Sequence, residues 1–189
     1  MNITIFGKGN MGSAIGKNLE SSENRVTYIT SQDQATNLGE LVILAVPYPA
    51  LDVIAQQYQD QLTGKVIVDI TNPLNFDTWD ELVVPANSSS AELLQTKLPK
   101  SKIIKAFNTN FADTLQTGMV GSTATTVLVA GDNEGKQLLK KALQDSSLVV
   151  MDAGKLKRAR ELEATGFLQM TLAANKQITW TGGFGIVND

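Results

Sequence analysis

Short apolar runs rich in β-branched residues alternate along the whole chain with segments whose apolar residues have helical spacing. The predicted strands are residues 3–6, 26–30, 41–46, 66–70, 103–106, 125–130 and 148–151, and the predicted helices are residues 11–19, 49–62, 91–98, 134–143 and 156–173. This alternation is typical of right-handed βαβ units. We therefore predict an α/β fold of the Rossmann type, with a doubly wound, mostly parallel sheet and helices on both faces.

The chain length of 189 residues favours a single domain of the Rossmann type over residues 1–189. We expect its last part, about residues 154–189, to form a C-terminal helix and a short tail. The segment from Ser89 to Glu92 has the spacing of a capping box, and Asp132 with Asn133 predicts a second helix start. Residues 75–87 are polar and interrupted by Pro85, which indicates a long surface loop of a kind that often has a function.

Composition removes several classes of function. The chain has no His and no Cys, which excludes disulfides, thiol nucleophiles and imidazole acid–base chemistry, and we predict no metal site. A formal charge of -3 argues against a nucleic-acid partner. The sequence has neither a secretory leader pattern nor an apolar run long enough for a membrane span, so we expect a cytoplasmic protein.

A GxGxxG motif lies between the first predicted strand and the first predicted helix, and it consists of Gly7, Lys8, Gly9, Asn10, Met11 and Gly12. In a βαβ unit, Gly7 would allow the tight turn, Gly9 would let the backbone approach a pyrophosphate, and Gly12 would let helix and strand pack closely. The motif predicts a dinucleotide site at the positive end of the helix. The alternative is a glycine-rich turn that serves packing alone.

The end of the second predicted strand bears on which dinucleotide binds. An acidic residue there would bind the ribose 2′-OH of NAD, whereas this chain has Thr30, Ser31 and Gln32. Neutral donors tolerate a 2′-phosphate, so NADP(H) is the predicted cofactor, although Asp33 follows and no Arg is present in this turn. An ordinary polar turn is the alternative reading.

The connection to the third predicted strand is short, because residues 32–40 leave no room for a full helix and another strand. We therefore expect a shortened second crossover, which would leave the adenosine end of the cofactor open to solvent.

Seven motifs in one order resemble the NADP oxidoreductases that depend on the deazaflavin coenzyme F(420), a family related to the N-terminal domain of pyrroline-5-carboxylate reductase and to the NADPH domain of membrane metalloreductases. The resemblance covers nearly the whole chain. The motifs are GKGNMG at 7–12, LVILAVPY at 41–48, VIVDITNPLN at 66–75, SSSAELL at 88–94, KAFNT at 105–109, VAGDN at 129–133 and DAGKLKRARELE at 152–163.

The resemblance implies roles for particular residues. Ser31 and Gln32 stand where the family has a Ser-Arg pair on the 2′-phosphate, and Gln32 departs from that pattern. The remaining implied positions are Ala45, Val46, Pro47 and Tyr48 along the cofactor, and Asn72, Pro73, Asn108 and Thr109 around the nicotinamide and acceptor.

Hydride transfer between a nicotinamide and a flavin-like ring needs stacking and exclusion of water more than an acid or base, which suits a chain without His. Reduction of a carbonyl or imine would need a proton donor, for which the candidates are Tyr48, Asp69, Lys105 and Thr109. Each of these has an ordinary structural alternative, and no catalytic residue is assigned.

After the last predicted strand, about one helix and a tail remain, so the acceptor must bind on this domain or at an oligomer interface. We expect a homo-oligomer, such as a homodimer. The apolar residues of the last predicted helix would form either core or a dimer face, and they are Leu156, Leu162, Phe167, Met170 and Leu172. The segment from Trp180 to Gly185 would either close over the nicotinamide or form a loosely packed tail.

The leading hypothesis is an NADPH-dependent oxidoreductase that exchanges hydride with a flavin-like, deazaflavin, quinone or metal-chelate acceptor. A catalytically silent NADP-binding, redox-sensing protein and a small carbonyl or imine reductase are the alternatives.

Overall fold

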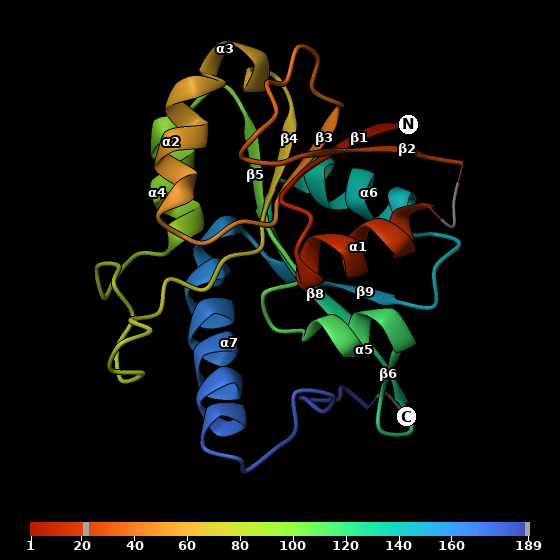
Figure 1. Ribbon diagram of the computed structural model, residues 1–189, viewed down its shortest axis with the longest axis vertical. Coiled ribbons are helices and arrows are strands. Elements are labelled where there is room, and N and C mark those ends of the chain that lie inside the picture. The colour runs from red at the N-terminus through yellow and green to blue at the C-terminus, as the bar shows by residue number, and fades with distance from the viewer. Residues whose placement is uncertain (21–22, 188–189) are drawn as a thin grey trace.

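The computed structural model describes residues 1–20 and 23–187 (Figure 1). Its main sheet has seven strands in the order β2-β1-β3-β4-β5-β8-β9. Their bounds are β1 Asn2–Phe6, β2 Arg25–Ile29, β3 Leu41–Leu44, β4 Val66–Asp69, β5 Lys102–Lys105, β8 Thr126–Gly131 and β9 Val149–Gly154. All neighbours pair in parallel except β5 and β8. The predicted mostly parallel sheet of Rossmann type is confirmed.

Helices cover both faces of this sheet, as predicted (Figure 1). One face packs against α1 Asn10–Glu20, α5 Ala112–Thr117 and α6 Asn133–Ala142, and the other against α2 Ala50–Gln57, α3 Gln59–Leu62 and α4 Ser90–Lys97. In β1, Ile3 and Ile5 join the first layer, whereas Phe6 joins the second, because successive strand residues point to opposite faces.

The second crossover is short. Residues 30–40, all of which the structure describes, form turns and bends without a helix. The strand β2 is consequently the edge of the sheet, next to β1. Thr30, Ser31 and Gln32 are exposed, in agreement with the expected open end of the site.

Some predicted boundaries differ from those observed. The predicted helix 49–62 divides into α2 and α3 at Tyr58, whose ring packs on Phe6 with 5.1 Å between centroids and whose hydroxyl lies 3.4 Å from the Ala35 nitrogen. The short helix α5 and the hairpin of β6 Met119–Val120 and β7 Thr123–Ala124 were not predicted. Both lie between β5 and β8, where the chain reverses direction.

Both predicted helix caps are confirmed. The Ser89 hydroxyl oxygen accepts a hydrogen bond from the Glu92 backbone nitrogen at 3.1 Å, and its hydroxyl donates to the Glu92 carboxylate. The Asp132 carboxylate accepts from the Gly135 nitrogen at 2.9 Å. These contacts satisfy backbone donors that a helix start leaves without an intrahelical acceptor.

The last helix, α7 Ala159–Ala174, follows a 3₁₀ turn at Leu156–Arg158 and extends beyond the sheet (Figure 1). Leu156 packs against the α2–α4 layer and Leu162 is buried, whereas Phe167, Met170 and Leu172 are half-buried. The apolar residues on this helix thus include both core and partly open positions. The predicted homo-oligomer stays a prediction.

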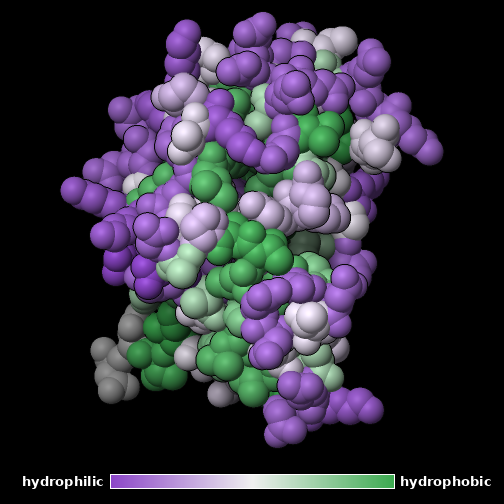
Figure 2. Space-filling view, turned by 90° about the vertical axis from the view of Figure 1, so that its left-hand side faces the viewer, coloured by the Kyte–Doolittle hydropathy of each residue, from purple (hydrophilic) through white to green (hydrophobic). Residues whose placement is uncertain are grey.

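The face in Figure 2 carries a band of apolar residues between hydrophilic margins. Exposed apolar side chains on α2, the 75–87 loop and α7 are Val53, Phe76, Val83 and Leu168. Within the part of the chain that the structure describes, no helix has the length and apolar character needed to cross a membrane.

Candidate functional site

A cleft of about 730 Å³ lies at the carboxyl ends of β1, β3, β4 and β5. It opens where the connections after β1 and β3 lead to helices on opposite faces of the sheet, the position at which open α/β sheets bind ligands. The lining residues are Gly9, Asn10, Met11, Gly12, Ala45, Val46, Pro47, Tyr48, Ile70, Thr71, Asn72, Phe76, Asn108, Asn110, Phe111, Ala112, Asp113, Met170 and Trp180.

The glycine turn forms one end of the cleft, and its three glycines occupy different environments. Gly7 has a φ of 95°, and a Cβ on Gly12 would lie 2.2 Å from the Gly7 carbonyl oxygen. Positions 7 and 12 therefore require glycine for the conformation and packing of the turn, whether or not a ligand is bound. A Cβ on Gly9 would meet no atom within 4 Å, so its space is open on the cleft side.

The helix that follows has the electrostatic character of an anion site. No acidic residue lies in the first turn of α1, and Lys17 lies in its last turn. The first intrahelical bond runs from the Ser13 nitrogen to the Gly9 oxygen at 2.9 Å, which leaves the preceding amides as helix-start donors. The turn thus provides backbone donors and an open approach, which fits a phosphate group.

The end of β2 lies beside the glycine turn but outside the cleft lining. The Gly7 nitrogen donates to the Ile29 oxygen at 2.8 Å, and the Lys8 ammonium lies 5.1 Å from the centroid of the Tyr28 ring. Thr30 is bound by Asp33, whose carboxylate accepts from the Thr30 nitrogen at 2.8 Å and from its hydroxyl at 2.6 Å. These hydrogen bonds, the side-chain one first, lower the pKa of Asp33.

The residues after β3, for which the resemblance implies a place along the cofactor, form a wall of the cleft. Tyr48 is half-buried, and the pKa of its hydroxyl is raised, first by burial and then by the negative charges of Asp52, Glu163 and Asp69. The shift is upward from the ordinary tyrosine value, so the Tyr48 hydroxyl is protonated at neutral pH and can donate a hydrogen bond.

Two asparagines from neighbouring strand ends join across the floor of the cleft. The Asn72 amide donates to the Asn108 backbone oxygen at 2.8 Å, and the Asn108 amide donates to the Asn72 side-chain oxygen at 2.9 Å and to the Leu162 oxygen at 2.8 Å. The Asn72 amide also lies 3.4 Å from the Met170 sulfur. This pair ties β4 and β5 to α7.

Two amide oxygens on this floor are buried without a hydrogen-bond partner among the described residues, Oδ1 of Asn108 and Oδ1 of Asn110. The Asn110 amide nitrogen is fixed by the Thr126 oxygen at 2.9 Å, which orients its oxygen. Unsatisfied buried acceptors are costly, and they fit a ligand that brings N–H or O–H donors.

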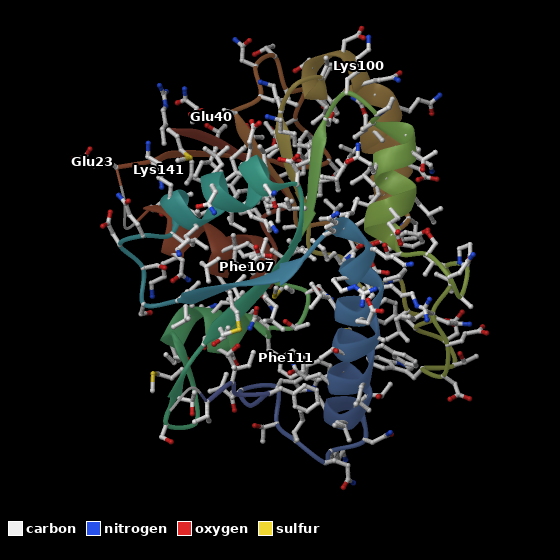
Figure 3. All side chains as sticks on the ribbon, turned by 180° about the vertical axis from the view of Figure 1, so that it is seen from behind. Glu23, Glu40, Lys100, Phe107, Phe111 and Lys141 are labelled. Atoms are coloured by element: carbon white, nitrogen blue, oxygen red, sulfur yellow. The ribbon has the colours of Figure 1, made fainter. Side chains whose placement is uncertain are left out.

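The opposite side of the cleft is aromatic. Phe107 is fully buried with a φ of 63°, a left-handed conformation that turns the chain out of β5 toward the cleft. Phe107 and Phe111 are labelled in Figure 3. The Phe111 ring contacts the Trp180 ring with 4.9 Å between ring centroids. The Phe184 nitrogen donates to the Gln169 side-chain oxygen at 2.9 Å, which holds the C-terminal segment against α7. Trp180 lines the cleft. Closure of this segment over a nicotinamide stays a prediction.

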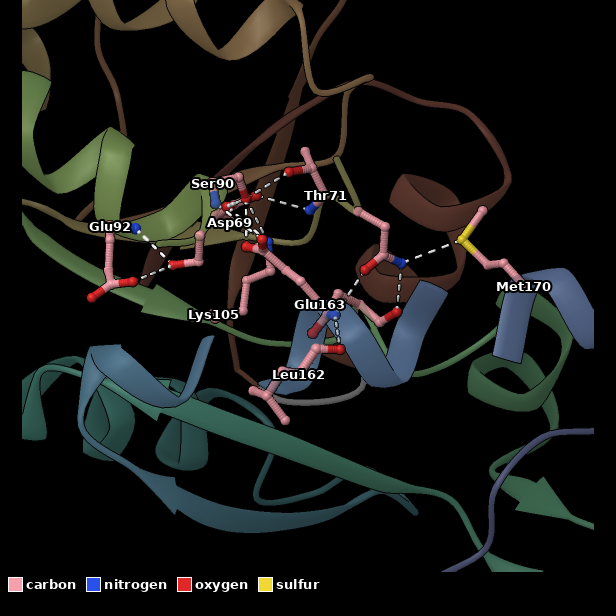
Figure 4. Close-up of polar contacts among 11 residues, drawn as sticks. Asp69, Thr71, Ser90, Glu92, Lys105, Leu162, Glu163 and Met170 are labelled. Atoms are coloured by element: carbon pink, nitrogen blue, oxygen red, sulfur yellow. Dashed lines mark hydrogen bonds and ion pairs between the residues drawn. The ribbon is translucent and has the colours of Figure 1, made fainter. Parts of the chain in front are cut away.

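The other predicted proton donors lie outside the cleft lining. Asp69 and Lys105 are fully buried beneath the floor in a cluster with Ser90 and Glu163 (Figure 4). Thr109 is also buried, and its backbone oxygen accepts from the Gln169 amide at 3.1 Å.

The structure brings most predicted site residues together: ten line the cleft, namely Gly9, Asn10, Met11, Gly12, Ala45, Val46, Pro47, Tyr48, Asn72 and Asn108. Those outside its lining are Gly7, Lys8, Thr30, Ser31, Gln32, Pro73 and Thr109. Lining residues without a predicted site role are Ile70, Thr71, Phe76, Asn110, Phe111, Ala112, Asp113 and Met170. Two of these residues could have been found from the sequence. Phe76 lies in the predicted 75–87 loop, and Asn110 lies directly after the predicted site residues Asn108 and Thr109.

Comparison with known proteins gives one family match. The family described as NADP oxidoreductase, coenzyme F(420)-dependent, matches residues 21–73. The chain is 30% identical over 135 residues to the F(420)-dependent NADP reductase of Methanocaldococcus jannaschii, covering 69% of this chain and 60% of that protein. It is 32% identical over 140 residues to Metalloreductase STEAP3 of Rattus norvegicus, covering 72% and 27%. The chain thus spans between 27% and 60% of the length of these relatives.

Solved structures share the fold. A protein from Arthrobacter sp. FB24 assigned as an F(420)-dependent NADP reductase superposes with a TM-score of 0.83 at 23% identity, covering 98% of this chain and 99% of that one. An imine reductase from Bacillus cereus superposes with a TM-score of 0.65 at 16% identity, covering 95% and 63%. The chain is therefore similar over part of its length to coenzyme F(420)-dependent NADP oxidoreductases, and it has the Rossmann-type fold of the structures it resembles.

Proposed function

We propose that the chain binds NADP(H) in the cleft and acts as an oxidoreductase that passes hydride to a flavin-like, deazaflavin, quinone or metal-chelate acceptor. The observation that carries this proposal is the glycine turn: Gly12 is required for packing, whereas Gly9 leaves open space at the start of α1 beside a cleft of about 730 Å³. The names of the relatives, an NADP reductase and a metalloreductase, support the same class of reaction.

Different residues would hold different parts of the cofactor. The backbone at Gly9 and the first turn of α1 would hold the pyrophosphate. Ser31, Gln32 and the Lys8 ammonium would meet the 2′-phosphate at the open end beside β2. The orphan oxygen of Asn108 would accept from the nicotinamide carboxamide. When bound, the reduced nicotinamide supplies the hydride.

The remaining part of the cleft suits a planar acceptor. Phe76, Phe111 and Trp180 line it with aromatic surface, and Met170 adds an adaptable apolar contact. Such walls stack a ring and exclude water, which are the requirements for hydride transfer between two cofactors. The orphan oxygen of Asn110 would accept from an N–H or O–H group on the acceptor.

One observation favours a second candidate, the reduction of a small carbonyl or imine. Tyr48 lines the cleft, and its hydroxyl is protonated at neutral pH. Such a hydroxyl can supply the proton that this reaction needs. Loss of activity in Tyr48→Phe, with NADPH affinity retained, would support this candidate.

Thermal-shift titrations with NADPH and NADH side by side test the proposal. A ligand present at 100 times its dissociation constant adds about 2.7 kcal/mol of stability. Stabilisation by NADPH above that by NADH is expected, followed by NADPH oxidation with members of an acceptor panel. Stabilisation without oxidation would instead indicate a redox-sensing or cofactor-delivering protein, and no response to either nucleotide would reject the proposed site.

A further inference from the structure

Asp113 brings a negative charge into the lining of the cleft. Among the lining residues that the structure describes, Asp113 is the acidic one, and none is a lysine or an arginine. Asp113 is exposed, and an exposed aspartate carries a negative charge at neutral pH. A ligand in the cleft therefore meets a carboxylate, and these lining residues offer no cationic side chain to compensate it.

The carboxylate belongs to the aromatic part of the cleft. Four consecutive residues line the cleft here, namely Asn110, Phe111, Ala112 and Asp113. The Phe111 ring contacts the Trp180 ring, and Asp113 follows two residues later in the first turn of α5. This part of the cleft is the proposed position of the acceptor. Asp113 thus borders the acceptor.

Contacts on both sides of Asp113 fix the backbone that presents it. Before it, the Asn110 amide donates to the Thr126 oxygen at 2.9 Å. After it, the Thr114 oxygen accepts from the Thr125 hydroxyl at 2.8 Å. Thr114 is buried, whereas Asp113 next to it is exposed. Packing of α5 against its neighbours therefore keeps Asp113 on the open side of the helix.

The Asp113 carboxylate is unpaired within the part of the chain that the structure describes. It takes part in none of the ion pairs between these residues. The contact of Asp113 with Thr117 uses the Asp113 backbone oxygen, which accepts from the Thr117 hydroxyl at 2.9 Å. The side-chain charge is consequently available to attract or repel a group bound beside it.

A second wall of the cleft has a negative environment as well. The pKa of the Tyr48 hydroxyl is raised, first by burial and then by negative charges. These charges belong to Asp52, Glu163 and Asp69. The charges that act on this wall thus have the same sign as Asp113, and an anion placed between them would be repelled.

The glycine turn has the opposite electrostatic character. The first turn of α1 contains no acidic residue, and the space at Gly9 is open to the cleft. Its backbone donors suit the anionic pyrophosphate. The helix α5, in contrast, has only six residues and carries Asp113 in its first turn. One part of the cleft therefore favours an anion, and the aromatic part disfavours one.

We propose that Asp113 selects acceptors by charge, so that the acceptor is an uncharged or cationic planar ring rather than one that bears phosphate or carboxylate groups. Asp113 is a specificity-determining residue, because it repels anionic acceptors without taking part in hydride transfer. The inference rests on the proposed function and narrows its class of acceptor. A neutral ring can stack on the aromatic walls without electrostatic cost, whereas an anionic group beside the ring meets the Asp113 charge.

Riboflavin and FMN are the test pair, because they have the same ring system and differ by the phosphate of FMN. In an assay without oxygen, NADPH transfers a hydride to the ring, and a proton from water completes the reduced flavin. The measured quantity is the ratio of kcat/KM for riboflavin to kcat/KM for FMN. We expect a preference for riboflavin of at least about threefold, which decreases at high salt because exposed charges are screened.

Three variants of Asp113 test whether this residue causes the preference. Asp113→Asn removes the charge at nearly constant shape, and it should lower the ratio by about three- to tenfold, as expected for one exposed unit charge. Asp113→Glu keeps the charge and should keep the preference, whereas Asp113→Lys should favour FMN. Asp60→Asn is the matched control, because it removes an exposed charge on α3 outside the cleft lining and should leave the ratio unchanged.

Equal kcat/KM values for the two flavins, a preference for FMN, or a ratio that Asp113→Asn leaves unchanged would overturn the inference. Fluorescence titration of the chain with each flavin, in the presence of NADP⁺, gives the ratio of the two Kd values without turnover. If the chain oxidises NADPH with no acceptor, the proposed function fails, and the Kd ratio still decides the selection by charge. Binding of neither flavin would also overturn the inference.

Discussion

The carboxylate of Asp33 holds Thr30 by two hydrogen bonds, at 2.8 Å from its backbone nitrogen and 2.6 Å from its hydroxyl. This pair closes the turn after β2 and places an exposed negative charge beside Ser31 and Gln32, the residues expected at the 2′-phosphate of NADP. The same turn thus combines neutral donors with a charge that repels phosphate.

We therefore predict that Asp33→Asn increases the affinity for NADPH relative to NADH by about three- to tenfold, as expected for one exposed unit charge. The gain should decrease at high salt, because exposed charges are screened. Nucleotide titrations at two salt concentrations measure it. Asp60→Asn on α3 removes the same charge elsewhere and should leave the ratio unchanged; an equal gain for NADH would contradict the assignment.

The glycine turn separates packing from ligand binding. Gly12→Ala forces a Cβ to within 2.2 Å of the Gly7 oxygen, and we expect a loss of about 1–3 kcal/mol in unfolding free energy as well as weaker NADPH binding. Gly9→Ala meets no atom within 4 Å, so it should keep the melting temperature but weaken NADPH at least tenfold, by about 1.4 kcal/mol. Melting curves with and without NADPH distinguish the two, and an unchanged NADPH response in Gly9→Ala would reject the pyrophosphate position.

Trp180 forms a wall of the acceptor end through its contact with Phe111. Trp180→Ala is expected to raise KM for a flavin or quinone by about tenfold, the loss of one stacking contact, with little effect on the Kd of NADPH. Trp180→Phe should keep part of the affinity. Trp79 packs against Phe76 and lies outside the cleft lining, so Trp79→Phe provides the control. If Trp180→Ala raised the Kd of NADPH as much as the KM of the acceptor, the assignment of Trp180 to the acceptor end would be contradicted.

Asp152 contributes a pH-dependent part of the stability. Its carboxylate oxygens lie 2.7 and 2.8 Å from the Lys136 ammonium, and this hydrogen bond, followed by that from the Gly154 nitrogen, lowers the pKa of Asp152. Because the folded pKa is lowered, the stabilisation is present above about pH 3.9, the usual Asp value, and is lost as the pH falls through the folded pKa.

Asp152→Asn should thus cost about 0.5–1 kcal/mol at pH 7, a value discounted for the exposure of this carboxylate, and almost nothing in strong acid. Urea unfolding at the two pH values measures the difference. Asp145→Asn, at another exposed acidic residue, is the matched comparison. A cost that is the same at both pH values would show that the Asp152 charge is not responsible.

The sequence by itself determined the main sheet, most of the helices and the glycine turn, because those signals are local. Strand residues such as Ile3 and Ile5 repeat at the strand period, and Ser89 and Asp132 cap helices through contacts within three residues. The GxGxxG motif needs only its neighbouring strand and helix to be recognised. The shortened crossover was predicted from the small number of residues between the second and third predicted strands.

Only the tertiary structure decided how the cleft is completed. Asn110, Phe111, Met170 and Trp180 meet there from three separate segments, and no local period relates them. The partners of Lys105 likewise come from β4, α4 and α7, so its burial, hydrogen bonds and ion pairs follow from packing of distant elements. A side chain's solvation and charge environment depend on these neighbours, which are distant in the sequence. They cannot be predicted from the residue's own segment.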